Sequence, residues 1–400
     1  MQLKLTFETG RKEINFRKKM KVQYDNKKRT DKKLRVEIVR GLEDINNLVQ
    51  EWDDLYSRSG NATPFYSRAW VHTFVSEKEN KGTPILITVW SDSILVALLP
   101  LTIRSYCGVK IALGTPADML CYTGILVDSE YPEALGTIAR TCAQEKIAHV
   151  FYNKYTPSQD VITNSFFEEL SKKGFVCKRW KRHDCLWTCL ETSFDEVLAK
   201  RRTGEQRRWL LRKERRVFKQ EGISVNCYKG REITPEIVKR IGVIQEDSWV
   251  KEEGKAVLGQ PFYQKLLIEI AKTDLALVWL MTKDEDDIAF IYSLHVNDRL
   301  YPKWMSYRHK YGTSSSLSYG KVLYMQMIRY ACDNGIRMLD LGFGLDDWKS
   351  VWAADKQEID TLISGRGFIG RIAIWLSGIL RMCARYKWFL SRYIRVWKKK

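Results

Sequence analysis

Met338-Leu-Asp-Leu-Gly-Phe-Gly-Leu-Asp-Asp-Trp-Lys349 is the stretch of this 400-residue chain that says most about its fold. Its first four residues form a short apolar run typical of a buried strand, and the glycines that follow let the backbone approach a ligand closely. Carboxylates, an ammonium and an indole then gather directly after the strand, as at a binding site of an α/β fold. The alternative is a simple turn in which Asp346 or Asp347 caps a helix.

The residues before this stretch predict an ordered series of elements. Residues 288–296 and 300–307 have the composition of two strands joined by a hairpin turn at Asn297-Asp298. Residues 312–320 form a loop rich in serine and glycine, and apolar residues then recur with helical spacing over 321–333. The predicted order is therefore hairpin, Ser/Gly loop, helix, strand and acidic turn.

This order resembles the GNAT acyltransferase superfamily, and more narrowly its Fem-type, CelD-like branch, which has two tandem GNAT-like domains. The resemblance rests on Ser318-Tyr-Gly320 at the start of the helix, and on Asp340-Leu-Gly-Phe-Gly344 followed by Trp348-Lys349 and Trp352. Tyrosine stands where the branch has proline in the first motif, and tryptophan stands for tyrosine before the lysine. Thr63-Pro-Phe-Tyr-Ser-Arg-Ala-Trp70 also resembles the entry to the first domain of that branch.

The resemblance implies an α/β fold with mixed sheets and two tandem GNAT-like acyltransferase domains. We expect a disordered basic tail over residues 1–33, an N-terminal domain over 34–190, a C-terminal catalytic domain over 191–364 and a cationic amphipathic helix over 365–400. Both domains repeat a hairpin, a helix and a strand, although no repeat is visible at the level of residues. Met20 is a second candidate for the biological start.

Positive charge is concentrated at the two ends of the chain. The formal net charge is +19; residues 1–40 carry 14 Lys/Arg against 5 Asp/Glu, residues 366–400 carry 10 Lys/Arg and no acid, and the remainder is balanced. A nucleic-acid-binding protein usually carries its basic charge on the folded body, so nucleic acid is not an expected partner unless a tRNA is the acyl donor.

The C-terminal residues have the pattern of a helix that lies on a membrane surface. Apolar residues recur at steps of three and four from Phe368 to Trp397, and arginines fall between them. The arginines exclude a membrane-spanning helix, whereas aromatic rings opposite arginines suit an anionic membrane surface. The alternative is a helix packed on the catalytic domain or on a second subunit. With no secretory signal peptide recognised, we expect a cytoplasmic protein that contacts the inner face of the membrane through residues 366–400.

The nine cysteines form no CxxC pair, which argues against a zinc ribbon, a thioredoxin motif and a disulfide framework. Cys185 and Cys189 lie near His183 in a strand-like run. Buried thiols are expected there rather than a partial metal site. No metal cofactor is predicted.

The resemblance implies transfer of an acyl group from a thioester, with acyl-CoA, in the first place acetyl-CoA, as co-substrate. The N-terminus of a helix offers backbone N–H groups and the positive end of a dipole to a pyrophosphate. We therefore predict that Ser315, Ser316, Ser318, Gly320 and Lys321 bind the cofactor. The alternative is that this loop only caps the helix.

The acceptor is expected to be a small molecule or glycan precursor, such as an amino sugar or amino acid of cell-envelope or exopolysaccharide synthesis. Its amine must lose a proton, and no order of residues typical of a nucleophilic triad appears, so direct attack in a ternary complex is favoured. A histidine inside a strand is alternatively a core residue. The catalytic candidates are Asp347, Lys349 and His295. The candidates for acceptor binding are Asp118, Tyr122, Asp346 and Trp348.

Residues 200–219 form the most basic segment inside the body of the chain, with ten basic and two acidic residues. The segment suits CoA phosphates, a tRNA donor or an anionic acceptor, and the alternative is a solvated helix face. Two other functions stay open at this point. One is aminoacyl transfer from aminoacyl-tRNA to a peptidoglycan precursor, and the other is a non-catalytic role in envelope assembly.

Overall fold

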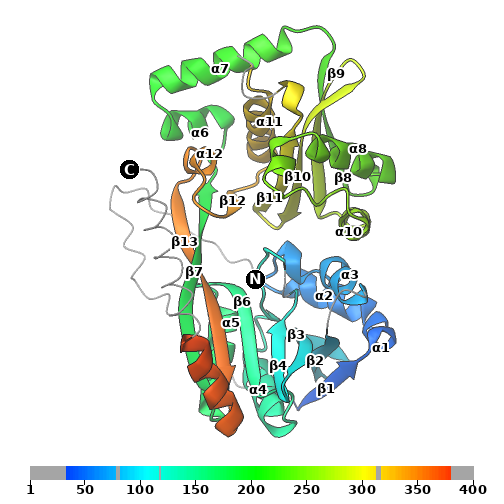
Figure 1. Ribbon diagram of the computed structural model, residues 1–400, viewed down its shortest axis with the longest axis vertical. Coiled ribbons are helices and arrows are strands. Elements are labelled where there is room, and N and C mark those ends of the chain that lie inside the picture. Colours follow the sequence, from blue (N-terminus) through cyan, green and yellow to red (C-terminus); the bar gives the residue numbers. More distant parts are fainter. Residues whose placement is uncertain (1–32, 78–81, 117–118, 312–316, 380–400) are drawn as a thin grey trace, which may run out of the picture. The chain divides into compact units, whose positions relative to one another are not determined.

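The structure is a computed structural model that describes residues 33–77, 82–116, 119–311 and 317–379. In the first half of the chain the strands are β1 (Leu34–Arg40), β2 (Thr83–Ser91), β3 (Ile94–Tyr106), β4 (Val109–Gly114), β5 (Leu126–Val127), β6 (Val150–Pro157) and β7 (Val176–Cys189). The helices of this half are α1 (Leu42–Asn46), α2 (Val49–Arg58), α3 (Arg68–Ser76), α4 (Ala134–Gln144) and α5 (Val161–Lys172), with a 3-10 turn at Pro64–Tyr66 (Figure 1).

The second half begins after β7. Its strands are β8 (Ile223–Lys229), β9 (Ala276–Lys283), β10 (Asp286–Val296), β11 (Arg299–Tyr307), β12 (Met338–Phe343) and β13 (Asp355–Gly365). Its helices are α6 (Phe194–Arg201), α7 (Gly204–Phe218), α8 (Pro235–Glu246), α9 (Trp249–Glu252), α10 (Pro261–Ala271), α11 (Tyr319–Asp333) and α12 (Asp347–Ser350). Two 3-10 turns lie at Gly230–Glu232 and His309–Tyr311, and a last described helix covers residues 367–379.

The two halves share one topology. In each half, four antiparallel strands, β1 to β4 or β8 to β11, are followed by a helix and by a strand parallel to the fourth. The helix and strand are α4 and β6 in the first half, and α11 and β12 in the second. This finding confirms the predicted mixed α/β fold and its duplication.

One mixed sheet joins the halves by an exchange of strands. The order of the sheet is β1-β2-β3-β4-β6-β13-β7-β12-β11-β10-β9-β8, with β5 beside β3. Strand β7, the last of the first half, therefore lies next to β12 of the second half, and β13, the last of the second half, lies next to β6 of the first. Strands β7 and β13 run side by side (Figure 1). The predicted domain boundary near residue 190 falls between β7 and α6 in sequence, and it stays a prediction.

Buried side chains also form a core that both halves share. Trp52 and Trp70 of the first half belong to the same cluster as Ile241 and Leu267 of the second half. A separate cluster lies under α11 and α7 and contains Leu323. Burial of a large apolar side chain contributes about 1.5–3 kcal/mol. The shared cluster therefore holds the halves in contact.

The elements predicted around the signature stretch are confirmed. The hairpin is β10 and β11, and Asn297 forms its turn with a φ of 55°. The helix predicted over 321–333 is α11, which begins two residues earlier, and the strand that starts at Met338 continues to Phe343 because it pairs with β7 that far. The predictions for residues 1–32 and 380–400 lie outside the described residues.

Candidate functional site

The parallel strands of the second half separate soon after they begin. Strands β11 and β12 pair only through Arg299 with Met338 and Leu300 with Leu339, although both strands continue beyond these pairs. A bulge in β11 leaves Lys303 without a partner on β10, and a bulge bends its strand and turns a side chain out of the regular alternation. The separation opens a space between two strands of one sheet.

A cavity of about 610 Å³ lies between β10, β11 and the helices α7, α9, α11 and α12. Nine of its lining residues are aromatic, among them Trp209, Trp348 and Trp352. The volume lies within the usual range for small-molecule sites, and a mainly apolar wall with few polar groups is typical of them. The cavity therefore suits a ligand with an extended apolar part.

The N-terminus of α11 forms one wall of this cavity. The predicted cofactor residues Ser318, Gly320 and Lys321 all line it, whereas Ser315 and Ser316 lie outside the described residues. Ser318 precedes the helix with a φ of 59°, and its side chain makes no hydrogen bond to the first turn. The first N–H groups of a helix lack partners inside the helix, so an anion can serve as their acceptor. A Cβ atom at position 320 would come within 3.0 Å of the Tyr307 ring, which favours glycine there.

Positive charges gather at the same wall. The Nζ atoms of Lys213 on α7 and Lys321 on α11 each lie 5.1 Å from the centroid of the Trp209 ring. Partial loss of hydration and the nearby charges of Lys321 and Arg216 hold the pKa of Lys213 below its usual value. Like charges that repel each other beside a cavity are stabilised when an anion binds between them.

Arg202 adds a further donor to the cavity lining. Its guanidinium lies 4.5 Å from the centroid of Trp352 and donates from one Nη to the Val351 carbonyl oxygen. Its other Nη is buried, and the described residues offer it no acceptor. Burial lowers the pKa of Arg202 to about 10. A buried donor without a partner calls for an explanation, and a ligand oxygen would supply one.

Of the predicted residues in the signature turn, some hold the turn together and one lines the cavity. The Lys349 ammonium is largely buried, donates to the Phe343 carbonyl oxygen at 2.6 Å and pairs with Asp346 at 2.9 Å, so these side chains hold the turn. Trp348 lines the cavity and packs edge-on against Tyr324. Asp347 begins α12, and its side chain is not described.

The other predicted residues do not line the cavity. His295 pairs with Leu300 near the hairpin turn, where burial lowers its pKa. Tyr122 is buried between the halves, and Asp118 lies outside the described residues. The catalytic and acceptor-binding roles of these residues stay predictions.

Tyr122 instead meets the signature strand. Its hydroxyl donates to Oδ2 of Asp340 at 2.6 Å and lies 3.1 Å from Sγ of Cys185. The Asp340 carboxylate is buried and also accepts from the Gly342 N–H at 2.9 Å and from the Cys185 thiol at 3.2 Å. Burial and this carboxylate raise the pKa of both Tyr122 and Cys185 well above the usual values. This network binds a loop of the first half to the signature strand of the second.

Cys185 is thus a buried thiol engaged with a carboxylate. Cys189, four residues later on β7, is exposed. Among the residues that the structure describes, no three His, Cys, Asp or Glu side chains are close enough together to hold a metal ion.

Comparisons with known proteins bear on the fold of the chain. Residues 204–350 match the family described as "Acetyltransferase (GNAT) domain". No curated protein sequence matches the chain significantly.

Solved structures with a similar fold include FemX, with a TM-score of 0.55 and 13% identity over 78% of this chain and 95% of that chain. They also include the C-terminal domain of a protein assigned as a lysylphosphatidylglycerol synthetase from Agrobacterium fabrum (TM-score 0.53, 13% identity, 84% and 96% covered). A third is L-PGS from Bacillus licheniformis (TM-score 0.50, 12% identity, 79% and 91% covered). The chain has a GNAT-type, Fem-like fold. At these identities the likeness shows the fold alone.

Lys303 is a residue of the GNAT-type half that the sequence patterns did not single out. It leaves β11 at the bulge, donates to the Leu120 carbonyl oxygen of the first half and lies 5.3 Å from the centroid of Phe65. Loss of hydration, together with the nearby charge of Lys349, lowers its pKa, although Cys121 and Asp340 act in the opposite direction. A lysine in the middle of an otherwise apolar strand was the signal that could have found it.

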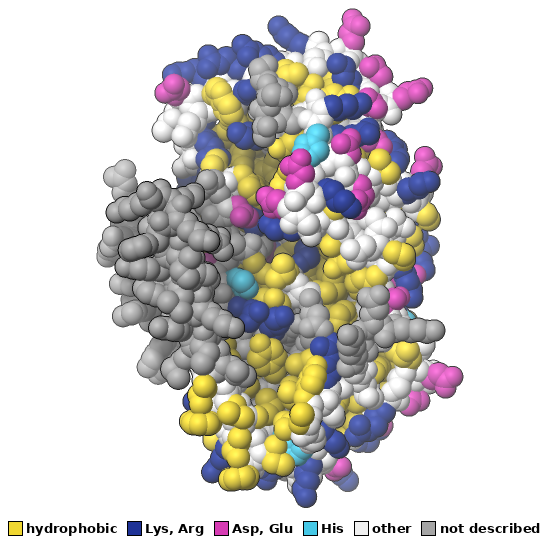
Figure 2. Space-filling model, viewed as in Figure 1, with side chains coloured by type: hydrophobic (Ala, Val, Ile, Leu, Met, Phe, Trp, Pro, Cys, Tyr) yellow, Lys and Arg dark blue, Asp and Glu magenta, His cyan; other side chains and the backbone are white. Residues whose placement is uncertain are grey.

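A second group of cations lies near the signature strand on the first half. Lys154 and Arg182 lie 5.3 and 5.2 Å from the centroid of the Tyr155 ring, which stacks on Phe343. Partial burial and these two cations lower the pKa of the adjacent His183. Tyr122 also contacts Phe343, so ring contacts link this group to Lys303 through Phe65. In Figure 2, Lys, Arg and His side chains gather around a hydrophobic hollow in the middle of the visible face. We name Lys154, Arg182, His183, Lys303 and Phe343 the seam surface.

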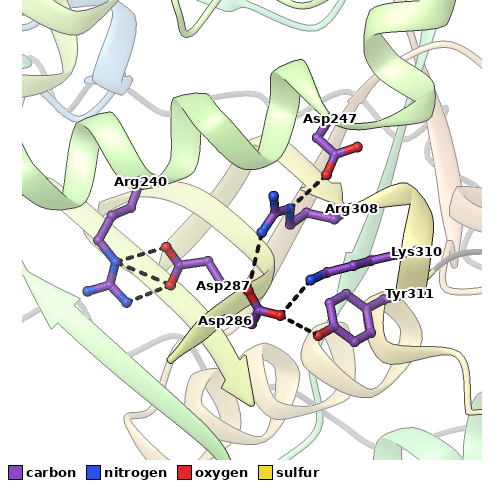
Figure 3. A network of polar contacts seen from close by, with 7 residues as sticks. All are labelled: Arg240, Asp247, Asp286, Asp287, Arg308, Lys310 and Tyr311. Atoms are coloured by element: carbon purple, nitrogen blue, oxygen red, sulfur yellow. Dashed lines mark hydrogen bonds and ion pairs between the residues drawn. The ribbon is translucent and has the colours of Figure 1, made fainter. Parts of the chain in front are cut away.

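A network of ion pairs holds the segment that leads into the Ser/Gly loop (Figure 3). Asp286 of β10 accepts from Lys310 at 2.5 Å and from the Tyr311 hydroxyl at 3.0 Å, and it pairs with Arg308 at 3.6 Å. Asp247, after α8, pairs with the same arginine at 2.8 Å. Because Tyr311 lines the cavity, this network positions one edge of the site.

Proposed function

We propose that this protein is an acyltransferase that binds an acyl-CoA thioester in the cavity of the second half and transfers the acyl group to an amine. The observation that carries the proposal is the meeting of three features at one cavity. These are the N-terminus of α11, which the Ser318 side chain does not cap, the cations Lys213 and Lys321, and an aromatic lining.

Each part of a CoA thioester finds a suitable group among these features. Its pyrophosphate needs N–H donors and positive charge, which the first turn of α11 and the two ammonium groups supply. Its pantetheine arm and acyl group need an apolar channel, which the aromatic walls supply. Arg202 offers one further donor to a ligand oxygen.

The reaction needs no covalent enzyme intermediate. The amine nitrogen attacks the thioester carbonyl carbon, the carbon–sulfur bond breaks, and the CoA thiolate takes a proton. The proton that the amine loses requires a base, and general bases work best when their pKa lies near the working pH. Lys303, whose pKa is lowered, joins Asp347 and His295 as a candidate for this role.

The seam surface favours an acceptor that carries a negative charge beside its amine. Among the described residues, neither Lys154 nor Arg182 forms an ion pair with an acid, and both flank one aromatic ring. An amino acid or a phosphorylated amino sugar would present a carboxylate or phosphate to these cations. We place acceptor binding there because the surface adjoins the signature strand through Phe343.

Turnover by the purified full chain tests the proposal. Release of free thiol from a panel of acyl-CoAs, from acetyl to long-chain, is measured with amino acids and amino-sugar phosphates as acceptors. We expect thiol release that depends on the acceptor and acylated amine in the mass spectrum. A chain that neither binds CoA nor releases thiol with any donor would refute the proposal, and would leave the aminoacyl-tRNA donor and the non-catalytic envelope role.

A second candidate donor is aminoacyl-tRNA. The basic side chains of α7 favour it, because they suit a nucleic-acid backbone. The same assay with radiolabelled aminoacyl-tRNA and no CoA distinguishes the two donors. Transfer from tRNA without CoA binding would replace the first proposal by the second.

A further inference from the structure

The helix of residues 367–379 is fixed to the sheet by one of its faces. A Cβ atom at Gly370 would lie 2.5 Å from the His149 carbonyl oxygen and 3.0 Å from the backbone of Gly365, so the helix approaches β13 as closely as glycine permits. One turn later Ile374 is buried against Val150 and Ile363. These contacts fix which face of the helix points away from the sheet.

The opposite face exposes large apolar side chains. Phe368 is 80% exposed and Trp375 is 63% exposed, and Ile372 lies between them on the same face. Hydrophobic side chains gather at the lower left of Figure 2, where Figure 1 shows this last described helix. Isolated exposed apolar residues are normal, but several on one helix face mark a surface that meets an apolar partner.

We infer that this face lies in the surface of an anionic membrane, with Phe368, Ile372 and Trp375 inserted at the headgroup level. The charge around the helix supports this partner. From Arg366 to the last residue the sequence holds ten Lys/Arg and no acid, with further aromatic residues among them. Aromatic and cationic residues together are typical of helices that lie in an anionic interface. Among the described residues, no helix has the length and apolar character needed to cross a bilayer.

A second copy of the chain fits this face less well. A symmetric dimer through the helix would bring the two strongly positive C-terminal segments together, and like charges in an interface are unfavourable. An anionic bilayer instead neutralises them. The membrane surface is therefore the occupant that the charge pattern favours.

Vesicle co-sedimentation of the full chain tests this inference. Vesicles of phosphatidylcholine alone are compared with vesicles that also contain phosphatidylglycerol. We expect binding to the second kind, weakened as salt rises because surface charge is screened. The double variant Phe368→Ser/Trp375→Ser should lower this binding at least about tenfold, because each aromatic ring loses its transfer from water.

The matched control is Tyr106→Ser/Val161→Ser, which removes two apolar side chains of 56% and 59% exposure from the first half. It should bind vesicles as the unchanged chain does. Phe368→Ser alone, at the most exposed position, is the second variant if the double variant folds poorly. A chain that ends at residue 379 keeps the anchored helix and should lose the preference for phosphatidylglycerol.

Several results would overturn the inference. They are no vesicle binding by the full chain, equal binding to both kinds of vesicle, or unchanged binding by the Phe368 variants. Light scattering supplies one more decisive result. If the full chain is a dimer and the double variant a monomer of normal thermal stability, the face is a protein interface and the membrane assignment is wrong.

Discussion

Removal of one ammonium at the α11 wall should weaken donor binding by a calculable amount. Lys213 and Lys321 each lie 5.1 Å from the Trp209 centroid, so their charges are no more than about 10 Å apart. At that distance their mutual repulsion in water is about 0.4 kcal/mol, whereas each attracts a phosphate charge about 4 Å away by roughly 1–4 kcal/mol, depending on the effective dielectric. The attraction to a diphosphate therefore exceeds the repulsion.

The expected effect of Lys321→Met is a loss of about 1.5 kcal/mol in CoA affinity at physiological salt, which corresponds to roughly a tenfold higher Kd. The Lys213 side chain is only partly buried and the Lys321 side chain is exposed, so we take the lower end of the range. Lys213→Met should have a similar effect. Calorimetric titration with CoA measures the Kd, and steady-state kinetics measures the corresponding rise in KM.

The matched control is Lys219→Met, which removes one exposed charge from the same basic segment. It should change the Kd less than about threefold, because an exposed charge away from the ligand is screened within a Debye length of about 8 Å. Raising the salt to 1 M should also reduce the difference in Kd between Lys321→Met and the unchanged chain. Equal effects of all three variants would show a general attraction rather than a site, and an unchanged Kd in Lys321→Met would refute the reasoning outright.

Three further predictions concern the seam and the edge of the site. Asp286→Asn should raise the KM for the donor, because it loosens Lys310 and Tyr311, whereas Asp287→Asn frees only Arg240 and should leave the KM unchanged. Because the ion pairs lower the pKa of Asp286, the KM of the unchanged chain should rise only as the pH falls through that lowered pKa. If Lys303 is the base, kcat/KM should rise with pH as Lys303 loses its proton, at a pH below the usual lysine pKa of about 10.4 because the pKa of Lys303 is lowered. Lys303→Met should abolish this rise, and a pH profile identical to that of the unchanged chain would exclude Lys303 as the base. Tyr122→Phe should lower the free energy of unfolding by about 2 kcal/mol, since it removes a short hydrogen bond to a buried carboxylate. Tyr324→Phe, whose buried hydroxyl has no partner among the described residues, should not destabilise the protein in a thermal melt.

The sequence predicted the elements of the second half well because their signals are local. Alternating strands, a hairpin turn at Asn297 and helical spacing after Ser318 each depend on neighbours in sequence. Ser318, Gly320 and Lys321, which the same local pattern predicts to bind the cofactor, line the cavity, and their role stays a prediction.

The parts that sequence reasoning missed depend on contacts between distant residues. The residues next to Lys303 in sequence do not indicate that it contacts Leu120 and Phe65 of the first half. Those next to Asp340 do not indicate that it accepts a hydrogen bond from Tyr122. The exchange of β7 and β13 between the halves also leaves no signal in the sequence of either strand. A pattern of residue types predicts a strand, but the neighbour of that strand in the sheet depends on how the whole sheet packs.

The two halves share a topology, yet the cavity described here belongs to the second, and the packing of the first half explains this difference. Where β11 and β12 separate, the second half leaves a space; at the equivalent place beyond β4, the first half has a buried segment. Thr123 of that segment bonds through its N–H to the Tyr155 carbonyl oxygen of β6 at 3.1 Å, and Gly114 abuts both Thr123 and Asn153.

The same segment carries Tyr122, whose hydroxyl reaches Asp340 of the second half. The residues that fill the space in the first half therefore also support the signature strand of the second. A duplicated fold has in this way been divided into one half that forms the cavity and another that braces it. We infer that variants which loosen residues 119–125 should disturb the signature turn before they disturb the first half itself.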